Sequence, residues 1–154
     1  MPTLPHRLLA VTAAVARAGL PSAGCNKTQT VPTAVLSTET KTGTVPPGGS
    51  DSKGFVINYI YSQTDGVITL KGLTSVATGA AVTTTLGLAF GAPAFDGTCT
   101  RATQFTINAA VIGTPYSTNG AAPFIGGNYC IVVFDVGTLT DIGAVNYTVD
   151  IQHY

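Results

Sequence analysis

Few residues in this sequence could carry out acid–base or nucleophilic chemistry. Two histidines occur among the 154 residues, and His153 is the only one beyond the first few positions. A hydrolytic dyad or triad needs a base beside a nucleophile, and histidine is the usual base. Because His153 lies one residue from the end of the sequence, we expect it to be a surface residue at a strand end. The sequence therefore predicts a protein without enzymatic activity.

Carboxylates are also sparse. Glu39 is the only glutamate, and most of the aspartates lie beside Gly or Ser, a context that is typical of turns. Asp96 and Asp135 are weak candidates for a metal site, because each lies a few residues from a cysteine whose bonding would draw the two carboxylates toward one edge. Calcium needs about six to eight oxygen ligands, so we expect Asp96 and Asp135 to cap loops through hydrogen bonds instead. No cofactor is predicted from these residues.

The three cysteines divide into Cys25 near the N-terminus and Cys99 and Cys130 in the body of the chain. An odd number in an exported protein leaves one cysteine that needs another explanation. If Cys25 carries a lipid, Cys99 and Cys130 remain as a pair whose disulfide would close a loop of about 30 residues. The alternative is two buried free thiols. The spacing is not CxxC, and a metal site is less favoured than either.

Residues 1–24 have the features of a secretory signal peptide. A weakly basic start is followed by a short apolar run over 8–16 and then by small residues, which is the order that export signals share. The alternative is an amphipathic N-terminal helix that stays attached to the domain. We favour removal of this segment and export of the protein.

The run Ala23-Gly24-Cys25 resembles a bacterial lipobox, in which the cysteine becomes the lipid-modified first residue. Ser22 departs from that motif, since an aliphatic residue is usual there. We therefore predict a lipid anchor on Cys25, a polar tether over 25–35 and a folded domain over 36–154. The protein would lie in the cell envelope, either lipid-anchored or secreted.

Composition narrows the class of partner. Charged residues make up 9% of the chain and hydrophobic residues 45%, so disorder is not expected. After residue 24, five basic and seven acidic residues remain. Nucleic-acid binding needs a clustered basic surface, and this balance argues against it.

Alternation of apolar and polar residues recurs from residue 36 onward, and no window there shows helical periodicity. A period of two is typical of half-buried strands. Seven or eight short strands with turn signals about every ten residues predict an all-β fold of one domain. We expect a jelly-roll-like antiparallel β-sandwich, preceded by the cleavable signal segment.

Individual segments give more specific expectations. Residues 128–135 form the most apolar stretch and predict a central strand that is covered on both faces. The last strand should bury four residues and expose the four that alternate with them. The buried set is Val145, Tyr147, Val149 and Ile151, and the exposed set is Asn146, Thr148, Asp150 and Gln152.

Local sequence signals predict the structure of three further segments. Asp65-Gly66 lies between two alternating runs and predicts a hairpin that joins them. Residues 105–111 predict an inward row with the sequence positions Phe105, Ile107, Ala109 and Val111. The stretch 113–127 is rich in Gly, Pro and Asn and predicts a loop. Tyr116 and Phe124 in that loop are candidates for contacts with a sugar or a protein, and the alternative is that they fold back over the sandwich.

Several motifs in the chain resemble bacterial pre-peptidase C-terminal-type domains. The opening matches at Gly43–Ser50, Phe55-x-Ile57-x-Tyr59 and Gly66–Leu70, and the closing section matches at Gly127–Gly137 and Tyr147-Thr148-Val149. The chain is especially similar to short bacterial lipoproteins that consist of little more than one such domain. The resemblance covers 36–154 and implies a jelly-roll sandwich, with calcium or a polymeric substrate bound by some family members.

Two functions remain open at this stage. The first is a non-enzymatic envelope lipoprotein that binds an unidentified polymer or protein or has a structural role. The alternative is a calcium-stabilised accessory domain that assists a secreted hydrolase.

Overall fold

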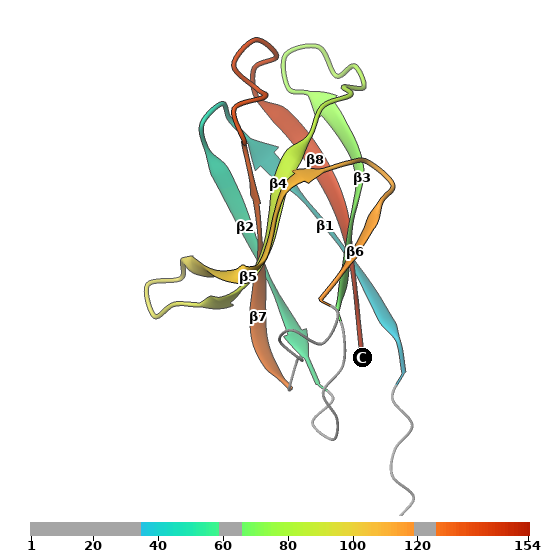
Figure 1. The fold of residues 1–154 in the computed structure, drawn as a ribbon, viewed down its shortest axis with the longest axis vertical. Coiled ribbons are helices and arrows are strands. Elements are labelled where there is room, and N and C mark those ends of the chain that lie inside the picture. Colours follow the sequence, from blue (N-terminus) through green and yellow to red (C-terminus); the bar gives the residue numbers. More distant parts are fainter. Residues whose placement is uncertain (1–34, 59–65, 119–125) are drawn as a thin grey trace, which may run out of the picture. The chain divides into compact units, whose positions relative to one another are not determined.

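The structure is a computed structural model that describes residues 35–58, 66–118 and 126–154. The regular elements in these ranges are eight β-strands, and every pairing between them is antiparallel (Figure 1). The predicted all-β antiparallel sandwich is confirmed. The signal segment, Cys25 and nearly all of the tether lie outside the described residues. No helix in the described ranges is long and apolar enough to cross a membrane.

The eight strands form two four-stranded sheets, which we call sheet A and sheet B. In spatial order, sheet A consists of β1 (Ser37–Val45), β8 (Val145–His153), β3 (Val67–Ser75) and β6 (Pro115–Ser117). Sheet B consists of β2 (Ser50–Ile57), β7 (Gly127–Phe134), β4 (Leu86–Pro93) and β5 (Cys99–Ala110). The consecutive strands β1 and β2 are therefore edge strands of different sheets.

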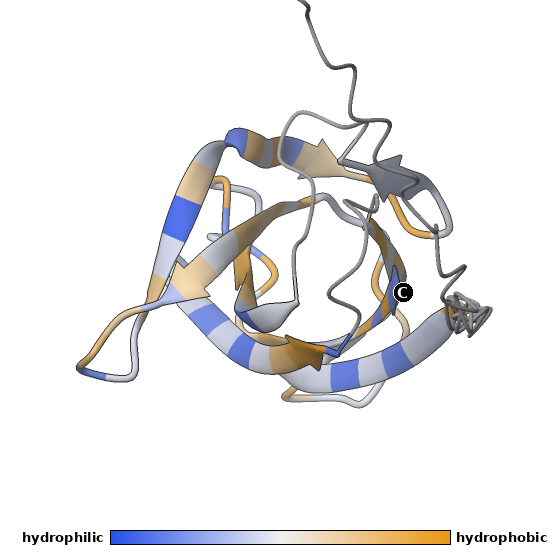
Figure 2. Cartoon of the chain, turned by 90° about the horizontal axis from the view of Figure 1, so that it is seen from below, coloured by the Kyte–Doolittle hydropathy of each residue, from blue (hydrophilic) through white to orange (hydrophobic). Residues whose placement is uncertain are grey.

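The core is formed by inward side chains of both sheets. Sheet A contributes apolar residues from β1, β3 and β8, and sheet B contributes them from β2, β4, β5 and β7. Along the strands, polar and apolar residues alternate (Figure 2), because successive side chains of a strand point to opposite faces. The largest fully buried members are Tyr147, Ile57, Ile68, Leu70, Leu86, Leu88, Ile131, Leu139 and Ile151.

The last strand has the predicted register. The inward row of β8 is at most 1% exposed, and the alternating residues are exposed or partly covered. Partial cover follows from the position of β8 between β1 and β3. The same alternation places His153 in the inward row, where it is only 4% exposed. The expectation that His153 is a surface residue is therefore wrong, because the period of two continues to the end of the strand.

The prediction of a doubly covered central strand is also confirmed. β7 lies between β2 and β4, and its residues Cys130, Ile131, Val132 and Val133 are all buried. Ile131 and Val133 belong to the core between the sheets. Cys130 and Val132 alternate with them and so point to the opposite face of sheet B.

The predicted hairpin at Asp65-Gly66 is wrong. β2 pairs with β7 in sheet B, whereas β3 pairs with β6 and β8 in sheet A. The chain therefore crosses from one sheet to the other between β2 and β3. A local turn signal reports a reversal of direction, but it does not determine which strands pair.

The predicted inward row over 105–111 is correct only at its start. Phe105 is buried and Ile107 packs against the core, but Ala109 is exposed and Val111 is 51% exposed. The register of β4 and β5 shifts between Ile107 and Ala110, so Ala110 takes the buried position. An extra residue in one strand moves all later side chains to the other face.

Candidate functional site

Cys99 on β5 and Cys130 on β7 form a disulfide, with their Cα atoms 6.0 Å apart. β4 lies between these strands in sheet B, and Gly91 of β4 pairs with Cys130. A Cβ atom on Gly91 would lie 2.9 Å from the sulfur of Cys99. The same Cβ atom would overlap the Thr100 carbonyl oxygen of β5, so glycine is needed there because both the neighbouring backbone and the disulfide lie close to β4.

The disulfide fixes the base of a hairpin that connects β4 to β5 and projects from the edge of sheet B (Figures 1 and 2). We call residues 91–101 the hairpin arm. Its tip is a tight turn in which the Gly97 amide donates to the Ala94 carbonyl at 3.1 Å, and the Ala94 amide donates to the Thr98 carbonyl at 2.8 Å. Gly97 has φ of 81°, which suits the left-handed position of a bulged hairpin turn.

Phe95 at this tip has a relative exposure of 115%, the highest among the large hydrophobic residues described. Phe95 was not singled out from the sequence. The sequence signal that could have identified it is an aromatic residue within the turn sequence Ala94-Phe95-Asp96-Gly97. This turn lies outside the alternating apolar pattern that would bury such a residue in a strand. Fixed turns that carry an exposed aromatic side chain are suited to contacts with another molecule.

Asp96 and Asp135 cap loops, as expected from the sequence. Asp96 Oδ1 accepts hydrogen bonds from the amide and the hydroxyl of Thr98 at 3.0 and 2.6 Å. These bonds hold the pKa of Asp96 below its usual value. Both carboxylates are thus engaged by their own loops. In the described ranges, no three His, Cys, Asp or Glu side chains form a cluster that could hold a metal ion.

Asp135 joins two turns at one end of the sandwich. Its Oδ1 accepts from the amides of Gly137, Thr138 and Leu139 at 2.9, 2.9 and 3.2 Å, and its Oδ2 accepts from the Gly48 amide at 2.8 Å. Burial opposes ionisation of this carboxyl, but the four amide donors outweigh it and hold the pKa of Asp135 below its usual value.

Tyr116 does not belong to an exposed binding loop. It lies on β6, is partly buried and packs against the core. Its hydroxyl accepts a hydrogen bond from the Val111 amide at 2.9 Å. Of the two interpretations of Tyr116, the structure supports the one in which the ring folds back over the sandwich, and not the exposed contact residue. Phe124 lies outside the described residues.

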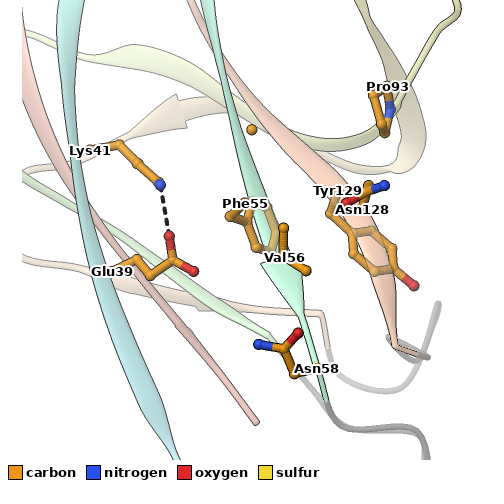
Figure 3. Close-up of a pocket in the computed structure, with 9 residues that line it drawn as sticks. Glu39, Lys41, Phe55, Val56, Asn58, Pro93, Asn128 and Tyr129 are labelled. Carbon is orange, nitrogen blue, oxygen red and sulfur yellow. Dashed lines mark ion pairs between the residues drawn. The ribbon is translucent and has the colours of Figure 1, made fainter.

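A groove follows the side of the sandwich where β1 and β2 form neighbouring sheet edges (Figure 3). Its volume is about 540 Å³, which is in the range of small-ligand sites. β1, β2, the end of β4 and β7 all contribute to it. We call this the β1–β2 groove, and its lining residues are Glu39, Lys41, Gly54, Phe55, Val56, Asn58, Pro93, Asn128 and Tyr129.

Charged side chains lie on the β1 side of the groove. Lys41 Nζ is 2.7 Å from Glu39 Oε2, and His153 Nε2 is 3.0 Å from Glu39 Oε1. Burial opposes ionisation of Glu39, but the hydrogen bonds from Lys41 and His153 outweigh it and hold the pKa of Glu39 below its usual value. His153 Nδ1 lies 3.4 Å from the Tyr154 carbonyl oxygen. Both ring nitrogens of His153 therefore face oxygen atoms rather than a nucleophile.

Aromatic rings form the other side. Phe55 stacks on Tyr129 with ring centroids 5.8 Å apart, and it also lies 5.5 Å from the His153 ring. Val56 is 48% exposed and Asn128 is exposed beside it across the β2–β7 pair. The groove thus combines apolar and aromatic surface with a few amide and charged groups, which is the usual composition of a binding site.

A second group of polar contacts lies where β1 and β2 approach each other, near Gly43. Tyr147 donates a hydrogen bond to Asp51 Oδ2 at 2.9 Å, and Lys53 Nζ lies 3.1 Å from the same oxygen. Burial, with the Asp51 carboxylate nearby, raises the pKa of Tyr147 above its usual value. Inward-pointing charges on edge strands also discourage edge-to-edge pairing with another sheet.

No protein-family model matches this chain, and no curated protein matches it. Among solved structures, an antigen and type I fimbria protein of Burkholderia pseudomallei is similar over 79% of this chain and 100% of that chain. The sequence identity is 15% and the TM-score is 0.26. At these values the likeness carries no inference about the site.

Proposed function

We propose that this chain is an exported cell-envelope lipoprotein whose sandwich is a non-enzymatic binding or structural module. In this proposal, 1–24 is the signal peptide, Cys25 carries the lipid and the tether over 25–35 joins it to the domain over 36–154. The Cys99–Cys130 disulfide carries the proposal. Disulfides persist in oxidising compartments, and this one leaves Cys25 as the odd cysteine that directly follows Ala23-Gly24.

The environment of His153 supports a non-enzymatic role. The side chain is buried and is held between Glu39 and the Tyr154 carbonyl. A general base must reach the proton of a nucleophile or of a water molecule. In its present position His153 serves to tie the end of β8 to the edge strand β1.

The β1–β2 groove is the surface that we assign to a partner, either a polymer or a protein. It presents a phenyl–phenol stack, two amide side chains and an ion pair in a hollow of about 540 Å³. The resemblance to pre-peptidase C-terminal-type domains remains part of this proposal. The calcium-dependent alternative has less support, since Asp96 and Asp135 already accept hydrogen bonds from backbone amides of the turns around them.

Export and anchoring can be tested by fractionation of the host cell. We expect the wild-type protein in the membrane fraction, with a lipid mass on an N-terminal Cys25. The Cys25→Ser variant should move to the soluble exported fraction. An unmodified N-terminus on the wild-type protein, or equal partition of both forms, would refute the anchor.

The groove can be tested by a binding screen against glycans and envelope proteins. Replacing Asn58, which lines the groove, by Ala should weaken any specific binding by about tenfold, whereas Thr42→Ala on the exposed face of β1 should not. Binding that is insensitive to Asn58→Ala would assign the contact to another surface.

A further inference from the structure

The hairpin arm and the β1–β2 groove lie next to each other on one surface. Pro93 lines the groove and precedes Phe95 by two residues. Figure 3 shows Pro93 on the same side of the groove as Asn128 and Tyr129. The molecule thus presents a projecting aromatic side chain beside a hollow that contains aromatic and apolar walls.

The arm is held in place by several independent contacts. The disulfide fixes its base, two backbone hydrogen bonds close its tip, and Asp96 accepts two more from Thr98. The guanidinium of Arg101 lies 4.5 Å from the centre of the Phe134 ring and fixes the returning strand. A single exposed hydrophobic residue is ordinary on a protein surface. Here, however, the turn that carries the ring is held in place, which lowers the entropic cost of docking it.

We propose that two copies of this chain form a symmetric dimer, in which Phe95 of each copy occupies the β1–β2 groove of the other. A surface that carries both a knob and its socket is self-complementary under a two-fold rotation, and the contact closes at two copies. This inference rests on the proposed function only in taking the groove as the contact surface. It does not depend on export or on lipid.

The chemistry of the two parts is complementary. The Phe95 ring would pack against Phe55, Val56 and Tyr129, which are apolar or aromatic groups of the groove. Asp96, next to the ring, would approach Lys41, which forms an ion pair with Glu39 in the groove. Residues 25–154 hold five basic and seven acidic side chains, so two copies carry only a small charge of the same sign and do not repel each other strongly.

The test uses the full chain with Cys25→Ser, so that no lipid can cause association. Sedimentation equilibrium over a concentration series should give a monomer–dimer equilibrium with no larger species. Phe95→Ser should raise the dimer dissociation constant at least about tenfold, as expected for an aromatic residue at the centre of an interface. Val111→Ser, at a half-exposed apolar residue just after β5, is the control and should not change it.

A second measurement follows the environment of the side chain at position 95. The sequence contains no tryptophan, so Phe95→Trp introduces a single fluorophore at the tip. Its emission should shift to shorter wavelength as the protein concentration rises, with the same midpoint as the dimerisation. In a Phe95→Trp/Val56→Lys variant, which places a cation in the apolar part of the groove, the shift should need a higher concentration.

Three results would overturn the dimer. The first is a monomer at every concentration, in which case the groove is free for another ligand. The second is a dimer that Phe95→Ser leaves unchanged, which would place the interface elsewhere. The third is a mass that continues to grow beyond two copies, which would indicate a head-to-tail contact instead of a reciprocal one. An unmodified N-terminus in host fractionation would refute the proposed anchor without affecting any of these measurements.

Discussion

At the scale of single residues, the meeting of the β1 and β2 edges leaves no room for a side chain at Gly43. A Cβ atom there would overlap Asp51 Oδ2 and would lie 2.6 Å from the Tyr147 hydroxyl. We expect Gly43→Ala to lower the free energy of unfolding by about 1 to 3 kcal/mol, because the Tyr147–Asp51 hydrogen bond must shift. Chemical denaturation measures this change.

Gly54 on β2 provides the matched control. A Cβ atom at Gly54 would meet only the Tyr129 carbonyl oxygen, at 3.8 Å. Gly54→Ala should therefore be neutral or slightly stabilising, since alanine restricts the unfolded chain. Equal effects of the two substitutions would show that glycine flexibility, and not crowding at Gly43, determines stability.

Asp135 gives a pH-dependent prediction. Asp135→Ala removes the acceptor of four amide hydrogen bonds and should cost about 1 to 2 kcal/mol at neutral pH. The folded-state pKa is lowered, so this stabilisation is complete above the unfolded-state pKa of about 3.9 and is lost as the pH falls through the folded value. The stabilities of the wild type and the variant should converge in acid. Asp141→Ala, at an exposed loop aspartate, should differ little from the wild type at any pH.

At the scale of the elements, sequence periodicity predicted strands well and predicted their partners poorly. The alternation of residues along β8 follows the direction in which its side chains point. The buried row of β8 could therefore be predicted from the sequence, and the same alternation extends to His153. The bulge in β5 leaves no comparable pattern in the sequence, because the inserted residue is of an ordinary type. The Asp65-Gly66 sequence signal likewise predicted a reversal of the chain but not the change of sheet.

The hairpin arm gives a prediction at the same scale. Replacing Cys99 and Cys130 by Ala opens a loop with a sequence separation of 31 residues. The chain-entropy model then expects a loss of about 3 to 4 kcal/mol in the free energy of unfolding. Hydrogen exchange should accelerate most in residues 91–101, whose position the bond fixes. Cys25→Ser is the control, and an unfolding midpoint that reductant does not change would contradict the role of the bond.

At the scale of the whole molecule, the candidate site depends on pairings between distant parts of the chain. The groove brings residues 39–41 beside 54–58 and 128–129, and it includes Pro93 from a fourth strand. From its local sequence alone, each of these residues is an ordinary strand residue or turn residue. The site can be identified only from the order of the strands in both sheets, because burial and contacts between sheets leave no short-range pattern in the sequence.

The same topology predicts where the chain can be cut and rejoined. Ser37 at the start of β1 and His153 at the end of β8 are cross-strand partners, so their Cα atoms lie about 5 Å apart and a short Gly-Ser linker can join the two ends. A circular permutant of residues 33–154 that opens between Thr78 and Gly79, in the exposed turn after β3, should fold with one cooperative transition. A permutant opened between Thr148 and Val149 should not, because β8 is the strand that pairs with both β1 and β3. Near-ultraviolet circular dichroism and denaturant titration distinguish these outcomes. Cooperative folding of both permutants would show that sheet A does not need an unbroken β8.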